Sequence, residues 1–482
     1  MEALDWLVIG VFFLALIGII VWVVRQKQND SADYFLGGRD ATWLAIGASI
    51  FASNIGSEHL IGLAGAGASS GMAMAHWEIQ GWMILILGWV FVPFYSRSMV
   101  YTMPEFLERR YNPQSRTILS VISLVSYVLT KVAVTVYAGG LVFQQVFGIK
   151  ELWGIDFFWI AAIGLVVLTA LYTIFGGMKS VLYTSVLQTP ILLLGSLIIL
   201  VLGFKELGGW DEMMRVCGAV TVNDYGDTMT NLIRSNDDAN FPWLGALIGS
   251  AIIGFWYWCT DQFIVQRVLS GKNEKEARRG TIFGAYLKLL PVFLFLIPGM
   301  IAFALHQKYI GAGGEGFLPM LANGTANADA AFPTLVAKLL PAGVKGLVVC
   351  GILAALMSSL ASLFNSSAML FTIDFYKRFR PETPEKKLVG IGQIATVVIV
   401  ILGILWIPIM RSVGDVLYTY LQDVQSVLAP GIAAAFLLGI CWKRTSAQGG
   451  MWGLIAGMII GLTRLGAKVY YSNAGEVADR KS

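Results

Sequence analysis

Charged residues are scarce in this sequence. Only 13% of its 482 residues are Asp, Glu, Lys or Arg, while 56% are hydrophobic, and the mean hydropathy is +0.70. Soluble domains carry charge on about a quarter of their residues. This balance excludes an ordinary soluble protein and predicts a chain that lies almost entirely in a bilayer.

Cysteine and histidine are also rare. Four cysteines lie far apart, and the chain has only three histidines, so we expect neither a disulfide framework nor a metal site. No pair of nucleophile and base and no phosphate-binding loop stands out, so we do not expect an enzyme. No basic block is present either, which argues against nucleic acid as a partner.

Long apolar runs fill most of the chain. About twelve runs of roughly 20 residues, the thickness of a hydrocarbon core, predict an all-α polytopic membrane protein. The first run follows an acidic start and has no small-residue cleavage site, so we expect a retained helix and not a signal peptide. The runs fall near 5–24, 43–67, 77–99, 115–146, 154–175, 181–204, 242–269, 281–305, 344–374, 388–410, 415–441 and 448–470.

Lysine and arginine gather in alternate loops. Because basic loops stay in the cytoplasm, this pattern predicts an N-terminus outside a multi-pass protein of the plasma membrane. The two long polar loops, 205–241 and 306–343, then fall outside and lack an apolar core pattern. We expect them to be caps and not separate domains.

Two apolar runs are interrupted by polar residues. They are 46–67 and 254–269, and each opens a block of five runs, 43–204 and 242–441. Interrupted helices in corresponding positions indicate inverted repeats with a solute site near the midplane. We therefore divide the chain into a leading helix with its loop, a first repeat, an outer loop, a second repeat, and a peripheral helix with its tail: 1–42, 43–204, 205–241, 242–441 and 442–482.

Several ionisable or amide side chains fall inside the apolar runs. Such groups are costly in a membrane and are default candidates for a site. Glu78, Lys288 and Gln422 lie deep in their runs, so we favour a functional role for them. By contrast, we expect residues near loops to lie at helix ends, to reach the interface or to form structural pairs: Arg267, Lys131 and Asp374.

Three serines crowd the segment 354–362. Ser358, Ser359 and Ser362 supply hydroxyl oxygens, and a hard cation such as sodium prefers oxygen ligands, including carbonyls freed by a broken helix. Small polar residues in membrane helices also serve close helix packing. Taken alone, the serines leave both interpretations open.

Five stretches resemble a known family. They are DYFLGGR (33–39), GASIFASNIGSEHLIGLAG (47–65), YWCTDQFIVQRVLSGKN (257–273), SSLASLFNSSAMLFTIDFYKR (358–378) and PGIAAAFLLGICWKR (430–444). The likeness to the sodium/glucose cotransporter group of the solute:sodium symporter family runs from about residue 30 to 470 in register. It implies the leucine-transporter fold, with a leading helix, two five-helix inverted repeats and peripheral helices.

The resemblance also implies site residues. A sodium ion would be held by three backbone carbonyls and two hydroxyls, those of Ala52, Ile55, Ala355, Ser358 and Ser359. A sugar would be contacted by polar groups and by an inner gate with a neighbouring indole: Asn54, His59, Glu78, Lys288, Gln422, Tyr257 and Trp258. The outer hydrophobic gate would be formed by Leu63, Trp77 and Tyr418.

The sequence departs from the family pattern at three places. Ser185 stands where the family usually has aspartate, and a second sodium site seen in some members would need a hydroxyl where Ala361 stands. We therefore expect one sodium per sugar. Gly254 replaces a polar residue that contacts sugar in relatives, so one hydrogen bond is lost or filled by another substrate hydroxyl. Relatives continue with one or two peripheral helices, which lie outside the transporting core.

The expected function is sodium-coupled import of a monosaccharide of the glucose or galactose type by alternating access. Its partners would be a small-molecule sugar, sodium and the lipid bilayer. Within the same family, myo-inositol, another polyol or a sugar acid is the nearest alternative substrate. A non-transporting sugar sensor is a second alternative, which the residue at Ser185 leaves open.

Overall fold

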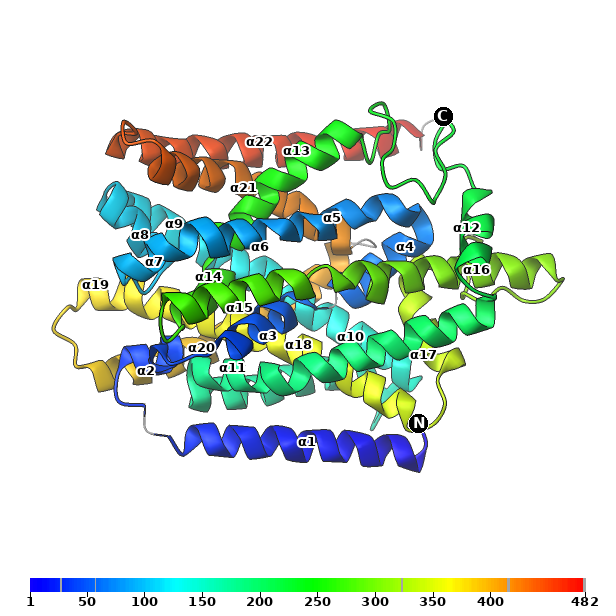
Figure 1. The fold of residues 1–482 in the computed structure, drawn as a ribbon, viewed down its shortest axis with the longest axis horizontal. Helices are drawn as coiled ribbons and strands as arrows, with labels where there is room; N and C mark the ends of the chain where they lie inside the picture. Colours follow the sequence, from blue (N-terminus) through cyan, green and yellow to red (C-terminus); the bar gives the residue numbers. More distant parts are fainter. Residues whose placement is uncertain (27, 57, 322–323, 414–416, 480–482) are drawn as a thin grey trace.

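The computed structural model describes residues 1–26, 28–56, 58–321, 324–413 and 417–479; within them, only the backbone is described at 145, 409–424, 465 and 468–479. The described chain is a bundle of helices whose long axes run in roughly one direction (Figure 1). Its two strands, β1 (Glu151–Leu152) and β2 (Ile155–Asp156), form a small antiparallel hairpin. The all-α prediction is confirmed.

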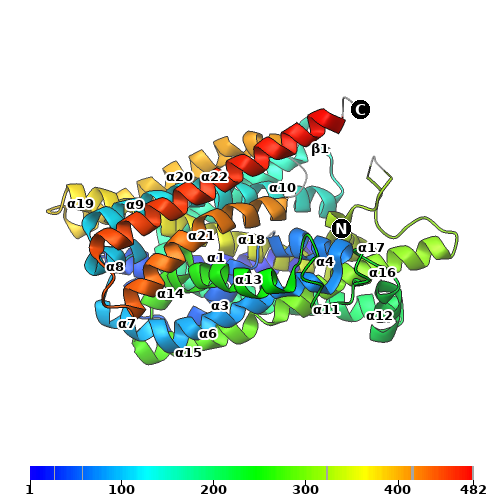
Figure 2. The ribbon, with the colours of Figure 1, turned by 90° about the horizontal axis from the view of Figure 1, so that it is seen from above.

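Two long helices lie at opposite edges of the bundle. Helix α1 (Ala3–Val24) contacts α11 and α18, and α22 (Ala447–Asp479) packs on α21 and α9. Figure 2, seen from above, shows α22 crossing one face of the bundle, whereas α1 lies at the opposite edge in Figure 1. Helix α22 continues past the predicted run 448–470. The elements between α1 and the first repeat are α2 (Ser31–Leu36) and η1 (Gly37–Arg39).

The first repeat begins with a broken span and ends with two spans that meet at Gly177. Gly177 has φ +54°, a backbone conformation that only glycine adopts without strain, so the two predicted runs 154–175 and 181–204 form one helical stretch with a turn inside it. Its helices, with short π or 3-10 segments marked η, are α3 (Trp43–Asn54), η2 (Glu58–Leu63), α4 (Ala64–Ser70), η3 (Gly71–Ala75), α5 (His76–Ile79), η4 (Gln80–Trp82), α6 (Met83–Ile86), η5 (Leu87–Phe91), α7 (Val92–Ser98), α8 (Met103–Arg110), α9 (Pro113–Ser126), η6 (Tyr127–Val132), α10 (Ala133–Phe147) and α11 (Phe157–Leu207).

The second repeat has the same plan. It opens with a span broken at Asp261, and a short helix again lies between its second and third spans, α17 where the first repeat has α8. After the outer-loop helix α12 (Trp210–Gly218), its elements are α13 (Trp243–Gly254), η7 (Phe255–Thr260), α14 (Gln262–Leu269), α15 (Glu274–Leu287), η8 (Val292–Leu296), α16 (Ile297–Gly311), η9 (Ala328–Ala330), α17 (Ala331–Leu339), α18 (Val344–Met369), η10 (Leu370–Tyr376), α19 (Lys377–Phe379), α20 (Glu385–Val413) and α21 (Leu417–Cys441).

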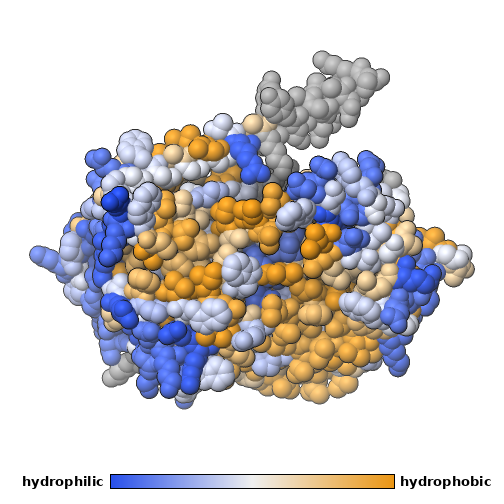
Figure 3. All heavy atoms as spheres, turned by 45° about the horizontal axis from the view of Figure 1, so that its top comes forward, coloured by the Kyte–Doolittle hydropathy of each residue, from blue (hydrophilic) through white to orange (hydrophobic). Residues whose placement is uncertain are grey.

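The helix lengths and the distribution of hydrophobic side chains on the surface are typical of a membrane protein. Among the described residues, eight helical stretches are long and apolar enough to cross a bilayer. Figure 3 shows hydrophobic side chains over the middle of the molecule and hydrophilic ones gathered at its two ends. The N-terminus, α12 and the end of α16 lie at one end in Figure 1, and α2, α8 and α19 lie at the other. The chain is therefore a multi-pass membrane protein.

The two long loops are better packed than the sequence predicts. We expected 205–241 and 306–343 to lack an apolar core pattern. That expectation is wrong, because α12 buries Met213 and Cys217, and α17 buries Phe332, Leu335 and Val336. Each helix has little more than two turns, which is too short for its apolar face to stand out from a polar loop.

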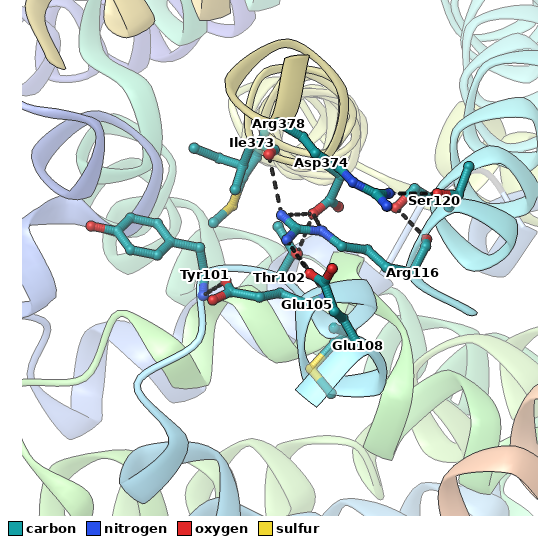
Figure 4. Close-up of polar contacts among 12 residues, drawn as sticks. Tyr101, Thr102, Glu105, Glu108, Arg116, Ser120, Ile373, Asp374 and Arg378 are labelled. Atoms are coloured by element: carbon teal, nitrogen blue, oxygen red, sulfur yellow. Dashed lines mark hydrogen bonds and ion pairs between the residues drawn. The ribbon is translucent and has the colours of Figure 1, made fainter. Parts of the chain in front are cut away.

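Asp374, a buried carboxylate near the loops, forms a structural ion pair. Arg116 joins Asp374 at 2.7 Å and Glu108 at 2.6 Å, and Thr102 donates to Asp374 at 2.8 Å. Figure 4 shows this network holding α8 and α9 against η10. The structural interpretation of Asp374 is therefore confirmed. The four cysteines are free, and three of them are buried.

Candidate functional site

The break in the first repeat lies against the serines of α18. Helix α3 ends at Asn54 and Ile55 is extended (φ −80°, ψ 105°), so the carbonyls of the last turn lack helical partners. The Ser359 hydroxyl reaches this turn: its Oγ donates to the Ser53 carbonyl at 2.7 Å and to the Ile55 carbonyl at 3.4 Å. Carbonyl and hydroxyl oxygens that converge in this way are the ligands that sodium takes.

Three further predicted sodium ligands are buried residues of α3 and α18, two helices that pack against each other. Ala52, Ala355 and Ser358 are all buried. Ser362 donates its hydroxyl to the Ser358 carbonyl at 2.6 Å, so it bonds within its own helix and not across the contact. Ser359 therefore faces the broken helix, whereas the Ser362 hydroxyl bonds to a carbonyl of its own helix.

A row of hydroxyls continues from this contact toward α11 and α14. Ser358 Oγ lies 3.2 Å from Ser185 Oγ, and Ser185 Oγ lies 3.4 Å from Ser49 Oγ. Ser49 Oγ in turn accepts from Arg267 Nε at 3.1 Å. We call Ser358, Ser185 and Ser49 the hydroxyl row. It is buried along its whole length.

Three predicted sugar contacts form one compact cluster. Lys288 Nζ lies 2.6 Å from Glu78 Oε2 and 2.8 Å from His59 Nε2, and His59 Nε2 lies 3.2 Å from Glu78 Oε1. Glu78 lies on α5, His59 on η2 after the break, and Lys288 at the C-terminal cap of α15. We call Glu78, His59 and Lys288 the charge cluster. One carboxylate and one ammonium balance each other there, as buried charges must.

The aromatic residues of the second broken span stand beside the charge cluster. Lys288 Nζ lies 5.7 Å from the centre of the Trp258 ring, and Trp258 makes an edge contact with Tyr257 at 4.8 Å. Asn54 Nδ2 donates to the Tyr257 hydroxyl at 2.9 Å. This bond joins the breaks of both repeats. Six of the seven predicted sugar contacts therefore come from segments that meet in the structure.

Several buried polar atoms near these residues have no partner among the described residues. They are Asn54 Oδ1, His59 Nδ1 and Gln80 Oε1. Buried polar atoms are normally hydrogen-bonded, so groups of this kind suit a ligand with several hydroxyls. The sequence did not single out Gln80. A Cβ at Gly254 would lie 2.9 Å from its Oε1, so the glycine is what lets the Gln80 amide approach α13.

The partner of Lys131 and its contact with Tyr257 could not be read from the sequence. Lys131 Nζ lies 2.6 Å from Asp261 Oδ2 and 4.8 Å from the centre of the Tyr257 ring. Tyr127 donates its hydroxyl to Asp261. Lys131 is a structural pair, as expected, but it touches the proposed inner gate. The position of Asp261 at the break in the second repeat was the available signal.

The residues predicted to form the outer gate are described only in part. Leu63 is buried at the end of η2, and Trp77 is half-buried on α5 beside His76, with ring centres 5.2 Å apart. The side chains of Tyr418 and Gln422 lie outside the described residues.

Arg267 differs from the other buried cations. It lies near the end of α14, as the sequence predicts, yet it is only 1% exposed and does not reach the surface. Its guanidinium stacks over Phe263 at 4.9 Å. No carboxylate lies within ion-pair distance of it in the part of the chain that the structure describes.

One charged group in the loop 205–241 is held by hydrogen bonds. Burial opposes ionisation of Asp238, but Asn223 and the backbone amides of Phe241 and Asn240 donate to its carboxylate, and together with Arg234 they lower its pKa. Arg234 also donates to the Ser70 carbonyl at the end of α4. This hydrogen bond attaches the loop 205–241 to α4 of the first repeat.

Comparisons with known proteins find relatives over nearly the whole chain. Residues 34–457 match the model of the sodium:solute symporter family. The human protein named sodium/myo-inositol cotransporter 2 is 38% identical over 479 residues, which cover 96% of this chain and 70% of that protein. The zebrafish sodium/glucose cotransporter 4 is 36% identical over 501 residues, covering all of this chain and 75% of the relative.

Solved structures share the fold at lower identity. A Na⁺-coupled sialic acid symporter, in a substrate-bound outward-open state, superposes with a TM-score of 0.78 at 21% identity, covering 96% of this chain and 98% of that one. MhsT in complex with L-phenylalanine superposes with a TM-score of 0.55 at 12% identity, covering 88% and 96%. These neighbours have the leucine-transporter fold, which confirms the predicted fold class.

Proposed function

The chain belongs to the sodium:solute symporter family, and on that premise we propose that it imports a monosaccharide of the glucose or galactose type, with one sodium ion per sugar. That it is a sodium-coupled solute symporter follows from the family. The proposal concerns the solute, the stoichiometry and the residues. The observation that carries it is the charge cluster, which lies beside the broken helix that Ser359 contacts.

The charge cluster suits a neutral ligand with many hydroxyls. A pyranose hydroxyl both donates and accepts, so it can bond to the Glu78 carboxylate, the His59 imidazole and the Lys288 ammonium in turn. The indole of Trp258 and the ring of Tyr257 offer apolar faces for the C–H surface of the sugar. Asn54 and Gln422 complete the proposed set.

Sodium binding would prepare the sugar site through the first broken helix. Ala52, Ile55 and Ala355 supply carbonyls, and Ser358 and Ser359 supply hydroxyls. Asn54, one residue before Ile55, is bonded to Tyr257, so an ion that orders this turn also orders the inner gate. Closure of Leu63, Trp77 and Tyr418 over the sugar, followed by opening of Tyr257, gives alternating access.

One ion supplies enough energy for accumulation. A sodium ion crossing about 100 mV gains roughly 2.3 kcal/mol, and a tenfold gradient adds about 1.4 kcal/mol. Together these support accumulation of several hundredfold. Ser185 and Ala361 support the single-ion stoichiometry, because Ser185 stands in place of the carboxylate that the family usually has, and Ala361 lacks the hydroxyl that a second site would use.

We assign the protein to the plasma membrane with its N-terminus outside. The end that carries α2, α8 and α19 bears most of the basic loops (Figure 1), and basic loops face the cytoplasm. The opposite end holds the N-terminus and the two packed outer loops.

A second candidate substrate is myo-inositol. The human relative that is 38% identical over 96% of this chain is named as a sodium/myo-inositol cotransporter. Inositol presents a ring of hydroxyls much like a pyranose, so the same cluster could bind it. Gly254 and the unpartnered oxygen of Gln80 change one side of the pocket and bear on this choice.

Uptake into proteoliposomes tests the function. We expect labelled glucose or galactose to accumulate above its external concentration only with an inward sodium gradient, and labelled sodium to enter in a one-to-one ratio. Accumulation of myo-inositol alone would transfer the assignment to the second candidate. Binding of sugar without accumulation, under any gradient, would support the sensor and contradict transport.

A further inference from the structure

Arg267 is a buried positive charge without a carboxylate partner in the described part of the chain. The other two cations near the site each have one at 2.6 Å, Lys131 with Asp261 and Lys288 with Glu78. Arg267 has a hydroxyl and an aromatic ring instead. Burying a charge in this way is costly, so a fold that retains it invites a functional explanation.

The hydroxyl row connects this charge to the proposed sodium ligands. Arg267 Nε bonds to Ser49 at 3.1 Å, Ser49 lies 3.4 Å from Ser185, and Ser185 lies 3.2 Å from Ser358. All three intervening groups are neutral. The nearby Asp261 carboxylate interacts with Arg267, but it is paired with Lys131 at 2.6 Å and is not a member of the row. The surroundings are buried, where charges interact more strongly than in water.

Arg267 lies on the basic-loop side of the sodium ligands. The start of α3 and the end of α14 meet there, since Ala41 N donates to the Ser270 carbonyl at 3.0 Å and Lys272 N donates to the Ala41 carbonyl at 3.0 Å. Ser49 lies between this end of α3 and the break at Ile55. An ion that leaves the ligands toward this end passes the guanidinium.

Helix α14 holds the charge in this place through its neighbour Gln266. Gln266 Nε2 donates to the Phe35 carbonyl at 2.7 Å and to Asn365 Oδ1 at 2.6 Å, and Gln266 Oε1 accepts from Ser366 at 2.7 Å. These bonds tie α14 to α2 and α18. Arg267 therefore remains on the basic-loop side of the proposed sodium ligands as long as α14 keeps this position.

We propose that Arg267 is a positioning residue that acts on sodium through Ser49 and Ser185. Its positive charge weakens sodium binding. It also bars sodium from leaving toward the cytoplasm until α14 moves. The inference rests on the proposed sodium ligands and the proposed orientation. It explains how a site built of oxygen atoms still releases its ion. It also gives Ser185 a role, because a carboxylate at this position would neutralise the barrier.

Sodium binding to the purified chain, measured with radioactive sodium and no sugar, tests the first part. We expect Arg267→Gln to bind sodium roughly tenfold more tightly, while Arg267→Lys, which keeps the charge, stays within about threefold of the parent. Unchanged or weaker sodium binding by Arg267→Gln, or equal effects of both variants, would overturn the proposal.

Sodium leak tests the second part. In proteoliposomes without sugar, Arg267→Gln should pass sodium several-fold faster than the parent and than Arg267→Lys. A leak that is the same in all three proteins would contradict the barrier.

A second pair of variants decides the matter if Arg267→Gln fails to fold. Ser185→Asp places a carboxylate between the guanidinium and Ser358, and Ser185→Asn has nearly the same shape without the charge. We expect Ser185→Asp alone to tighten sodium binding, again by roughly tenfold. Equal sodium affinity in the two variants would contradict the proposal. If the parent chain binds no sodium at all, the proposed function fails first, so the two failures are distinguishable.

Discussion

The charge cluster and the hydroxyl row are both buried and polar, but they treat charge in opposite ways. In the charge cluster, the Glu78 carboxylate and the Lys288 ammonium lie 2.6 Å apart. The hydroxyl row contains no charge of its own and ends at Arg267, which has no carboxylate partner in the described part of the chain. The difference matches the proposed ligands. A neutral sugar needs surroundings that are already balanced, whereas sodium brings its own charge.

The largest effect should follow from unbalancing the charge cluster. Glu78→Gln leaves the Lys288 ammonium buried without its partner, which costs about 3–5 kcal/mol. We expect a marked fall in thermal stability and loss of sugar binding. Thermal unfolding of the purified protein with and without sugar measures both.

The matched control removes both charges. Glu78→Gln combined with Lys288→Met restores neutrality, so its stability should recover toward that of the parent while sugar binding stays lost. If the double variant is as unstable as Glu78→Gln alone, the loss does not come from an unpaired charge, and the contrast between the two regions fails.

A smaller effect is expected at the neutral region. Ser359→Ala removes one hydroxyl that faces the broken helix, which costs about 1–3 kcal/mol and weakens sodium binding by roughly 5- to 150-fold. Thermal stability should fall less than in Glu78→Gln, because a hydrogen bond is lost but no charge is left unpaired. Ser362→Ala is the control, since this hydroxyl bonds within α18. Equal sodium affinities in the two variants would remove Ser359 from the site.

The smallest effect concerns the edge of the charge cluster at Gly254. A Cβ there would lie 2.9 Å from Gln80 Oε1, so Gly254→Ser should displace the amide and change the preference between glucose and myo-inositol by a few-fold, about 1 kcal/mol or less. Gly249→Ala, on the same helix, meets nothing within 4 Å and should leave the preference unchanged. Competition uptake of the two substrates measures it, and an identical preference in both variants would exclude Gln80 from the pocket.

Much of the fold was predictable because it depends on local pattern. Apolar runs of membrane length and polar interruptions in 46–67 and 254–269 mark the spans and the two broken helices, and the structure breaks both where expected. The turn at Gly177 and the short helix α17 were harder, since a single backbone angle and a two-turn apolar face leave little trace in the sequence.

The site was predictable as a set of residues but not as a set of contacts. The partner of Lys131 is 130 residues away, at Asp261, and Gln80 reaches the space at Gly254 from another span. Such pairings depend on how each helix is rotated about its axis, which one sequence does not reveal. For the same reason, the isolation of Arg267 became visible only when its neighbours were known.

The central claim is that sodium at the break of α3 prepares the sugar site beside it. The most direct test is the affinity of the purified chain for its sugar, measured in sodium and in choline, for the parent and for Ser359→Ala. We predict that sodium tightens sugar binding at least about tenfold in the parent and has little effect in Ser359→Ala. Equal sugar affinity in sodium and choline for the parent would contradict the account.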